Sequence, residues 1–430
     1  MHVLPQLREL KEKYPDDVEI VGVHSGKYTA ERDTAHIRDA SIRLGAVHPT
    51  LNDRQLRVWR SYAVNAWPTL VAVDPRGYVV GVHAGEYEAA DFVPFIERVL
   101  DAARAAGTLR SGPLHFLPDE PTVAPGQLAY PGKVAVDGQR IAIADSGHHR
   151  IIVGTLDDSG KRMQVSRTLG GSDPRYRDGD APRFNFPQGL AFAGDTLYIA
   201  DAGNHSIRAA SLDTGGVRTI AGNGRQASTL EDLDAGALSS PWDLALADDK
   251  LFIAMAGLHQ IFAMDLATGR TGVHSGSGAE ELHDGTHADA ALAQPMGICL
   301  AGDVLCFTDS ESSAVRTSAC DPRGRVRTIV GTDLFDFGDV DGTGDDVRLQ
   351  HPQGIALATD GRLLVADSYN GALKWIDRER KSAEIWLRGF HEPSGVALTG
   401  FHIYVADTNA HRIAVVDRTT GAIDNLQMSF

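Results

Sequence analysis

Five aspartates recur at equivalent places along the chain and are the first candidates for chemistry. Each ends a short apolar run and opens a small polar turn: Asp145, Asp201, Asp309, Asp367 and Asp407. A ring of carboxylates could serve as acids, bases or cation ligands. An active site rarely repeats with a structural unit, whereas turn chemistry must repeat with it, so we favour a structural role. In this interpretation each carboxylate forms an Asx-type turn and accepts backbone N–H groups before the next strand.

Four histidines share a second equivalent position, four residues after each of four turn openings: His149, His205, His259 and His411. Three histidines brought to one level could hold zinc. Nothing in the sequence selects three of the four. Because histidine occurs at this position in four of the six copies, we favour a role in packing between repeats over a metal-binding site.

The acidic segment 336–346 is the best local candidate for a metal site. Asp339, Asp341 and Asp345 lie among glycines and could offer oxygen ligands to calcium. The twelve-residue calcium-loop pattern with its final glutamate is absent. The Asp341-Gly342 pair has counterparts before two other repeats, at Asp178-Gly179 and Asp284-Gly285. We therefore favour a shared loop that brackets successive units, and we predict no metal and no other cofactor.

The three cysteines, Cys299, Cys306 and Cys320, lie close together in the sequence. Cys299 and Cys306 fall on segments expected to pair as strands, so a disulfide between them is conceivable. A buried reduced pair is favoured, because three cysteines make no disulfide framework and suit a cytoplasmic protein. Gly-x-Ser-x-Gly, phosphate-loop and His-Glu-x-x-His signatures are absent from the sequence.

The elements that must position these residues are six copies of one unit. Each copy leads from a proline-headed apolar strand to the polar turn: residues 131–145, 187–201, 241–255, 295–309, 352–367 and 393–407. Their prolines are separated by 56, 54, 54, 57 and 41 residues, room for four short strands in each unit. Four antiparallel strands, six units and no helical period predict a six-bladed β-propeller over residues 131–430. Residues 107–130 form the predicted linker before it.

Residues 1–106 have a mixed α/β pattern instead. Apolar residues at helical spacing predict a helix over 1–14, and a mostly apolar strand follows over 18–24. The remaining predicted elements are helices over 30–44 and 52–62, a strand–turn–strand over 69–83, and a closing helix over 89–106.

This order resembles the C-terminal two-thirds of a thioredoxin fold, and specifically the thioredoxin-like domain of NHL-repeat proteins and redoxins. Three segments carry the resemblance: His2-Val-Leu-Pro5, Tyr62-Ala-Val64 and Trp67-Pro68-Thr69. In that family the proline that matches Pro68 is cis, a minority state of X–Pro bonds. The resemblance therefore implies a cis bond before Pro68.

The repeat turns resemble those of the Asn-His-Leu (NHL) family: residues 145–150, 201–205 and 407–412. Three copies depart from the pattern, with Met255 for the aspartate, no histidine after Asp309, and Gly371 at the histidine position. The strand that completes the sixth blade is predicted from residues 422–428 or from residues 114–117. As a whole the chain resembles a bacterial thioredoxin–NHL-propeller protein.

The first domain departs from the family at its beginning. Relatives carry a Cys-x-x-Cys pair just before the residue that matches Met1, and an earlier strand that lies between the strands matching 18–24 and 69–74. We favour a start that is internal to a longer gene, because a parallel sheet resists losing its middle strand. The alternative is a domain that has lost its redox chemistry. With this start, residues 18–24 and 69–74 should leave a gap or pair directly.

The formal net charge of −16 argues against a nucleic-acid partner, since phosphate binding needs concentrated Lys and Arg. No apolar run approaches the roughly 18 residues of a membrane span. Our first hypothesis is a non-catalytic, cytoplasmic scaffold whose propeller binds a protein or peptide. The second is a thiol–disulfide oxidoreductase or peroxide-handling redoxin whose reactive cysteines lie upstream of Met1. A propeller lyase or lactonase is the third.

Overall fold

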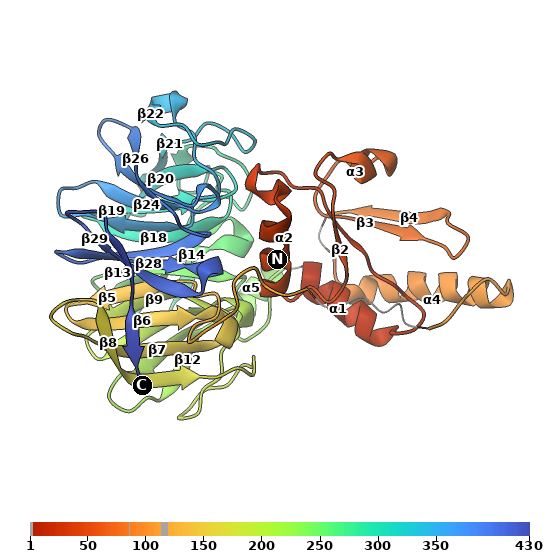
Figure 1. The fold of residues 1–430 in the computed structure, drawn as a ribbon, viewed down its shortest axis with the longest axis horizontal. Helices are drawn as coiled ribbons and strands as arrows, with labels where there is room; N and C mark the ends of the chain where they lie inside the picture. Colours follow the sequence, from red (N-terminus) through yellow and green to blue (C-terminus); the bar gives the residue numbers. More distant parts are fainter. Residues whose placement is uncertain (1–2, 86, 113–118) are drawn as a thin grey trace. The chain divides into compact units, whose positions relative to one another are not determined.

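The computed structural model describes residues 3–85, 87–112 and 119–430. The chain divides into two compact units, Met1–Ala124 and Pro125–Phe430 (Figure 1). Residues 114–117, one of the two candidates for the closing strand, lie outside the described residues. Among the described residues, no helix combines the length and the apolar character that crossing a membrane requires.

Over its described residues, the first unit contains four α-helices and four short strands. They are α1 (Val3–Lys13), β1 (Gly22–His24), α2 (Thr34–Arg43), β2 (Thr50–Asn52), α3 (Arg57–Ser61), β3 (Thr69–Val73), β4 (Val79–Ala84) and α4 (Ala89–Ala105). Helix α2 begins after Asp33, whose Oδ1 accepts hydrogen bonds from the backbone N–H groups of Ala35 and His36. The predicted helix over 52–62 is shorter than expected, and strand β2 precedes it.

The strands of this unit form two separate two-stranded sheets. β1 pairs in parallel with β2, and β3 pairs antiparallel with β4. Within the described residues β1 and β3 therefore leave a gap, which is one of the two outcomes expected for residues 18–24 and 69–74. Val23 on β1 and Val73 on β3 are 41% and 46% exposed. Such exposure is unusual for strands of a parallel sheet, because both faces of a parallel sheet are normally covered by other elements.

The second unit is a six-bladed β-propeller, which confirms the fold predicted from the repeats (Figure 1). Blade 1 contains β5 (Val134–Asp137), β6 (Arg140–Asp145), β7 (Arg150–Leu156) and β8 (Arg162–Gly170). Blade 2 contains β9 (Pro187–Ala193), β10 (Thr196–Asp201), β11 (Ser206–Ser211) and β12 (Val217–Ala221). Blade 3 contains β13 (Pro241–Ala247), β14 (Lys250–Met255), β15 (Gln260–Asp265) and β16 (Thr271–Ser275).

The remaining three blades follow the same order from the inner to the outer strand. Blade 4 contains β18 (Pro295–Ala301), β19 (Val304–Asp309), β20 (Ala314–Ala319) and β21 (Arg325–Val330). Blade 5 contains β23 (Gly354–Leu357), β24 (Leu363–Asp367), β25 (Ala372–Asp377) and β26 (Ser382–Arg388). Blade 6 contains β27 (Pro393–Leu398), β28 (His402–Asp407), β29 (Arg412–Asp417) and β30 (Ile423–Asn425). Two-residue strands, β17 (Gly285–Thr286) and β22 (Gly342–Thr343), extend blades 4 and 5.

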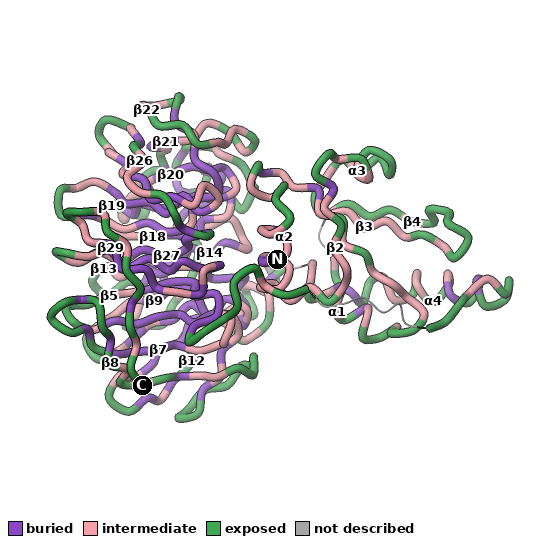
Figure 2. Tube along the Cα trace, in the orientation of Figure 1, coloured by how far each residue is buried: buried purple, intermediate pink, exposed green. Residues whose placement is uncertain are grey.

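Six apolar clusters fill the junctions between neighbouring blades, one at each junction, and a smaller one contains Trp242 and Met296. The cluster that joins blade 6 to blade 1, for example, packs Ile413 and Val415 against Ile143 and Ile152. Figure 2 shows the buried residues concentrated in the propeller strands. Because both faces of each blade are covered by neighbours, near-continuous apolar strands such as β6 are stable here although their sheets are antiparallel.

Ring closure uses the C-terminal segment in two ways. β30 is the outer strand of blade 6, and β31 (Gln427–Ser429) pairs in parallel with β8 of blade 1. The strand predicted over 422–428 is therefore two short strands that serve different blades. The two strands separate at Leu426, which is buried in the cluster between blades 6 and 1.

Candidate functional site on the propeller axis

The residue two places after each blade proline lies where the inner strands converge. It is glycine in four blades: Gly189, Gly297, Gly354 and Gly395. A Cβ atom on Gly189 would lie 2.5 Å from Cα of Asp243, and one on Gly395 would lie 2.8 Å from Cα of Lys133. The close approach of neighbouring inner strands therefore requires glycine at these positions.

Blades 1 and 3 carry oppositely charged residues at the same position. Lys133 Nζ lies 3.0 Å from Asp243 Oδ2, and it also donates to the carbonyl oxygens of Met296 and Gln353, at 2.9 Å each. One ammonium group from blade 1 thus contacts blades 3, 4 and 5. Burial lowers the pKa of Lys133, and the carboxylate of Asp243 opposes that shift.

A cavity of about 100 Å³ surrounds this pair. Its lining comes from the inner strands of all six blades: Lys133, Val134, Leu190, Asp243, Leu244, Ile298, Ile355 and Val396. The ammonium group has three N–H donors and three acceptors, so the charged form of Lys133 has a hydrogen-bond partner for each of its protons. The arrangement is a cross-link over the axis that closes the channel between the inner strands.

Lys133 and Asp243 were missed in the sequence analysis, although a signal for them exists. The third residue of each repeat is glycine in four copies, and the two exceptions have opposite charges. A pair of charges at one repeat position predicts contact in a closed ring, even across 110 residues of chain.

The five turn aspartates are fully buried, each with 0% of its surface exposed. In every case Oδ1 accepts from the backbone N–H of the residue two places before the proline of the same blade, at 2.6 to 2.8 Å: Ala129, Asn185, Ala293, Gln350 and His391. The carboxylates accept backbone N–H groups as predicted, but the Asx-type turn is wrong, because the side chains of Asp145, Asp201, Asp367 and Asp407 do not cap the short helical turns that follow. Each carboxylate instead links the end of the second strand of its blade to the segment that leads into the first strand, through this hydrogen bond.

The second carboxylate oxygen binds a cation in all five of these blades. In blades 2 and 4 the cation is an arginine seven residues later, with Arg208 Nη1 2.6 Å from Asp201 Oδ2 and Arg316 Nη1 2.7 Å from Asp309 Oδ2. Blade 5 uses a lysine at that position. In blades 1 and 6 an arginine five residues later, Arg150 or Arg412, takes the same role.

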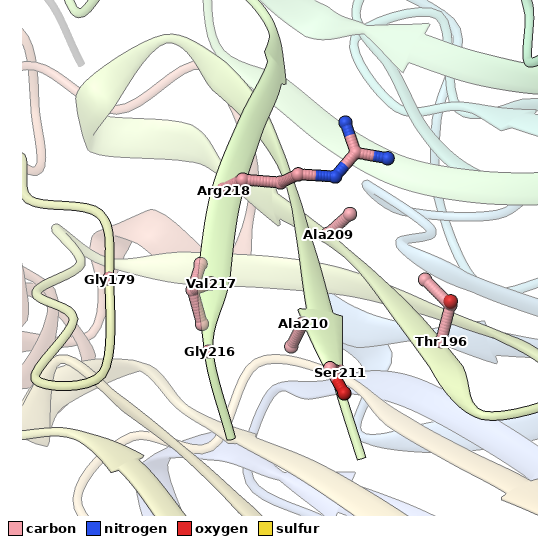
Figure 3. Close-up of a pocket in the computed structure, with 8 residues that line it drawn as sticks. All are labelled: Gly179, Thr196, Ala209, Ala210, Ser211, Gly216, Val217 and Arg218. Carbon is pink, nitrogen blue, oxygen red and sulfur yellow. The ribbon is translucent and has the colours of Figure 1, made fainter. Parts of the chain in front are cut away.

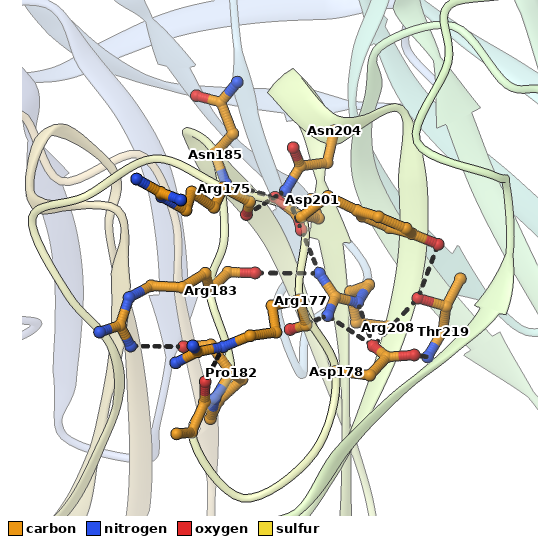
Figure 4. A network of polar contacts seen from close by, with 12 residues as sticks. Arg175, Arg177, Asp178, Pro182, Arg183, Asn185, Asp201, Asn204, Arg208 and Thr219 are labelled. Atoms are coloured by element: carbon orange, nitrogen blue, oxygen red, sulfur yellow. Dashed lines mark hydrogen bonds and ion pairs between the residues drawn. The ribbon is translucent and has the colours of Figure 1, made fainter.

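Asp178, Asp284 and Asp341, the aspartates of the Asp-Gly pairs, complete these clusters. Figure 4 shows the cluster that contains Asp178. Asp178 Oδ1 lies 2.6 Å from Arg208 Nη2, and its Oδ2 accepts from the backbone N–H of Thr219 on β12. Asp284 repeats the arrangement with Arg316 and Thr328. The loop before each of these blades therefore binds the outer strand of the blade that follows it. The sequence analysis predicted a loop that links two successive units.

The acidic loop in blade 5 has a cation of its own. Lys374 Nζ lies 2.9 Å from Asp339 Oδ1, 3.1 Å from Asp341 Oδ1 and 3.7 Å from Asp367 Oδ2. Asp345, the third calcium candidate, lies in a separate short helical turn, Gly344–Asp346. In the part of the chain that the structure describes, no group of three or more His, Cys, Asp or Glu side chains is arranged to hold a metal ion.

Burial dominates the titration of Asp201, Asp309, Asp367 and Asp407. It raises the pKa of Asp201 to about 6 and that of Asp367 to about 7, although Arg208 and Lys374 act in the opposite direction. It also raises the pKa of Asp309 and of Asp407. Burial therefore opposes ionisation more strongly than the nearby cation favours it.

Blade 3 replaces the whole ionic cluster with apolar residues. Met255 stands for the aspartate and Phe262 for the cation, and both pack with Leu238 in the cluster that joins blades 2 and 3. The loop before this blade contains the short helix α5 (Leu230–Asp234) instead of an Asp-Gly pair. Three separate sequence changes in this blade thus have one physical cause, the absence of the buried charge.

The four repeat histidines lie between blades. Nδ1 accepts from the backbone N–H of the residue before the next blade's proline, at 3.0 to 3.3 Å: Phe186 for His149, Ser240 for His205, Gln294 for His259 and Tyr130 for His411. All four histidines have left-handed backbone angles, with φ from 49° to 54°. Ser313 and Gly371 take the position in blades 4 and 5 with similar angles, and Ser313 Oγ accepts from His351 N–H at 3.2 Å.

In the first unit the Trp67–Pro68 bond is cis, the conformation implied by the resemblance. The indole Nε1 of Trp67 donates to the carbonyl oxygen of Ser25 at 2.7 Å, and its ring packs 4.5 Å from that of Trp59. Asp53 accepts from Ser25 Oγ and from the first backbone N–H groups of helix α3. Burial acts to raise the pKa of Asp53, but these hydrogen bonds outweigh it and lower the pKa.

A second cavity, of about 210 Å³, lies beside the outer strands of blade 2 (Figure 3). Its lining is Gly179, Thr196, Ala209, Ala210, Ser211, Gly216, Val217 and Arg218. Arg218 is the one charged residue among these eight, so the lining lacks a set of converging charged groups. We assign no chemistry to this cavity.

The fold and these clusters define a thioredoxin-like α/β unit joined to a six-bladed propeller of NHL type. A family model described as Thioredoxin-like matches residues 1–79, and one described as Outer membrane protein assembly factor BamB matches residues 132–424. NHL repeat-containing protein 2 of Gallus gallus is 37% identical over 483 residues, which cover 99% of this chain and 66% of that protein. Protein SUPPRESSOR OF QUENCHING 1, chloroplastic, of Arabidopsis thaliana is 37% identical over 460 residues, covering 98% of this chain and 43% of that protein.

The chain belongs to the family of NHL-repeat propeller proteins with a thioredoxin-like N-terminal domain, homologous to NHL repeat-containing protein 2, and its repeat region belongs to the propeller family described as Outer membrane protein assembly factor BamB. It spans 66% of the length of the chicken relative and 43% of the plant relative. Among solved structures, one described as Crystal structure of Nidogen/Laminin Complex aligns with a TM-score of 0.48 and 18% identity, covering 66% of this chain and 91% of that chain.

Proposed function

We propose that the propeller is a rigid scaffold that binds a protein or peptide through the loops of one face. In each blade the connections into the first strand and from the second to the third strand lie on the same face. Four of the connections into a first strand are long, over residues 171–186, 222–240, 276–294 and 331–353. Long loops on a rigid frame suit recognition, because their side chains vary while their bases stay fixed.

The observation that carries this proposal is the placement of Tyr176 on the first of these loops. The ring lies 5.1 Å from the guanidinium of Arg208, and its hydroxyl donates to Thr219 Oγ1 at 3.1 Å. Although the ring contacts Arg208 and the hydroxyl is hydrogen-bonded, the side chain of Tyr176 is 43% exposed. A tyrosine fixed before binding loses little conformational freedom on contact, which is why such residues are enriched at interfaces.

Peptide selection on the immobilised full chain tests the proposal. We expect enriched peptides that bind in solution, and a loss of affinity of about tenfold or more in Tyr176→Ala, the scale of an aromatic hot spot. Phe401→Ala is the matched control, because Phe401 is 80% exposed and lies on the opposite face, between β27 and β28. Failure to enrich peptides, or equal loss in the two variants, would contradict the proposal.

Thiol–disulfide exchange is the second candidate function, and the first unit supplies its support. The family model described as Thioredoxin-like matches residues 1–79, and Val23 on β1 and Val73 on β3 are exposed. The three cysteines of the chain all lie in blade 4. Reading the DNA upstream of Met1 distinguishes the two functions: an in-frame Cys-x-x-Cys directly before it would support the redox function, and a stop codon there would count against it.

A further inference from the structure

Blade 4 contains two cysteines that face each other on adjacent strands. Cys299 on β18 and Cys306 on β19 are direct partners in the antiparallel register. Directly opposed residues project to the same face of a sheet, with Cα atoms about 4.5–5.5 Å apart, a separation that a disulfide can span. Both are free thiols, and both pack in the apolar cluster between blades 4 and 5.

An arginine of the neighbouring blade approaches one of the two thiols. Arg378 Nη1 lies 4.0 Å from Cys306 Sγ, and Arg378 Nε donates to the carbonyl oxygen of Gly361 at 3.3 Å. A hydrogen bond with Cys299 and the guanidinium of Arg378 lower the pKa of Cys306, while the same hydrogen bond and burial raise the pKa of Cys299. The pair therefore consists of a thiolate-prone nucleophile and a thiol that keeps its proton.

We propose that Cys306 and Cys299 form a reversible dithiol that a small hydroperoxide oxidises to an internal disulfide. The Cys306 thiolate attacks one peroxide oxygen and the O–O bond breaks, which leaves a sulfenic acid on Cys306 and releases water after protonation. The sulfur of Cys299 then attacks the Cys306 sulfur and expels the hydroxyl group as a second water, with the thiol proton of Cys299. Two thiols are oxidised, one hydrogen peroxide is reduced to two waters, and an external dithiol reverses the change.

Burial restricts the class of oxidant. Cys306 is 0% exposed and Cys299 is partly exposed, so the oxidant reaches the Cys306 sulfur only through local opening of the blade, which admits a compact neutral peroxide more readily than a bulky disulfide. Cys320, at the end of blade 4, is the internal control. Its pKa is raised, chiefly by burial, and it is not a register partner of either cysteine.

The test uses the full chain treated with hydrogen peroxide, followed by thiol counting in denaturant and peptide mapping. We expect wild type to lose two of its three thiols with a Cys299–Cys306 linkage, and Cys320→Ser to form the same linkage at the same rate. Cys299→Ser should trap a sulfenic acid on Cys306 that reacts with dimedone once the protein is denatured. Glutathione disulfide at equal concentration should react at least tenfold more slowly.

Arg378→Met should slow oxidation about tenfold and move its pH profile to higher pH, because the guanidinium no longer favours the thiolate. Arg378→Lys keeps a cation and should recover part of the rate, and an unchanged urea midpoint in either variant separates chemistry from misfolding. Preferential oxidation of Cys320, an unlinked Cys299 and Cys306 after peroxide treatment, or an unchanged rate in Arg378→Met would overturn the proposal.

Discussion

His411 in blade 6 accepts a hydrogen bond at Nδ1 from the backbone N–H of Tyr130, the residue before the proline of blade 1, at 3.0 Å. The same bond joins blades 1 to 2, 2 to 3 and 3 to 4 through the other repeat histidines. At His411 it joins the last blade to the first. The residue that marks the repeat in the sequence thus also closes the ring.

Replacing His411 tests the weight of that closing bond. His411→Ala should lower the free energy of unfolding by about 1–2 kcal/mol, because a buried N–H loses its acceptor. His411→Ser should cost less, since Ser313 accepts the equivalent bond through its hydroxyl in blade 4. Urea unfolding of both variants measures the difference. Equal destabilisation would show that the side chain of His411 contributes through packing alone.

Met255→Asp restores the repeat residue to the one blade that lacks it, and should nevertheless destabilise the protein. No cation stands at position 262, so the carboxylate would be buried unpaired, at a cost of about 3–5 kcal/mol. Met255→Leu, the matched apolar control, should cost less than about 1.5 kcal/mol. Thermal unfolding distinguishes the two. An aspartate tolerated as well as leucine would contradict this account, because the carboxylate would then have found a hydrogen-bond donor or a cation in blade 3.

Lys374→Met should destabilise blade 5 strongly, because it leaves Asp339, Asp341 and Asp367 without their shared ammonium group. The expected loss is about 3–5 kcal/mol, the scale of an uncompensated buried charge. Wild type tests the calcium hypothesis: it should show no shift of melting temperature with calcium, since Lys374 and Arg388 already pair with the carboxylates of the loop. A clear calcium-dependent rise of the melting temperature in wild type would contradict this assignment.

His274 predicts a specific pH dependence of stability. The residue lies on β16, its Nε2 is 2.9 Å from the carbonyl oxygen of Ala319, and its ring lies 4.4 Å from that of His287. Burial lowers its pKa from 6.5 to about 4. Between these two values the unfolded chain binds a proton that the folded chain does not, so this contribution to stability rises as pH increases from 4 to 6.5.

The comparison with His274→Phe isolates that contribution, because other titrating groups are common to both proteins. The stability of wild type relative to the variant should increase across this pH range, by of the order of 1–3 kcal/mol. Urea unfolding at half-unit pH intervals gives the curve. A difference that stays constant with pH would show that His274 keeps its ordinary pKa in the fold.

The repeat made the propeller predictable, because six copies of one pattern indicate one unit and their number gives the blades. The ionic clusters were not predictable in the same way. Lys374 stands 33 residues after Asp341, and only the folded blade brings its ammonium into the acidic loop, so the loop alone suggested calcium. Likewise the turn aspartates suggested a local turn, whereas their partners lie 16 or 17 residues earlier in the chain.

Lys133 and Asp243 provide the most direct test of where recognition occurs. The double variant Lys133→Met/Asp243→Leu removes both charges, which should leave stability within about 1–2 kcal/mol of wild type, whereas either single change should cost about 3–5 kcal/mol. The decisive measurement is the dissociation constant of a peptide selected on wild type, determined for this double variant and for Tyr176→Ala. We predict an unchanged constant for the double variant and an increase of about tenfold or more for Tyr176→Ala. Lost binding in the double variant, with Tyr176→Ala unaffected, would contradict the account and place recognition on the axis.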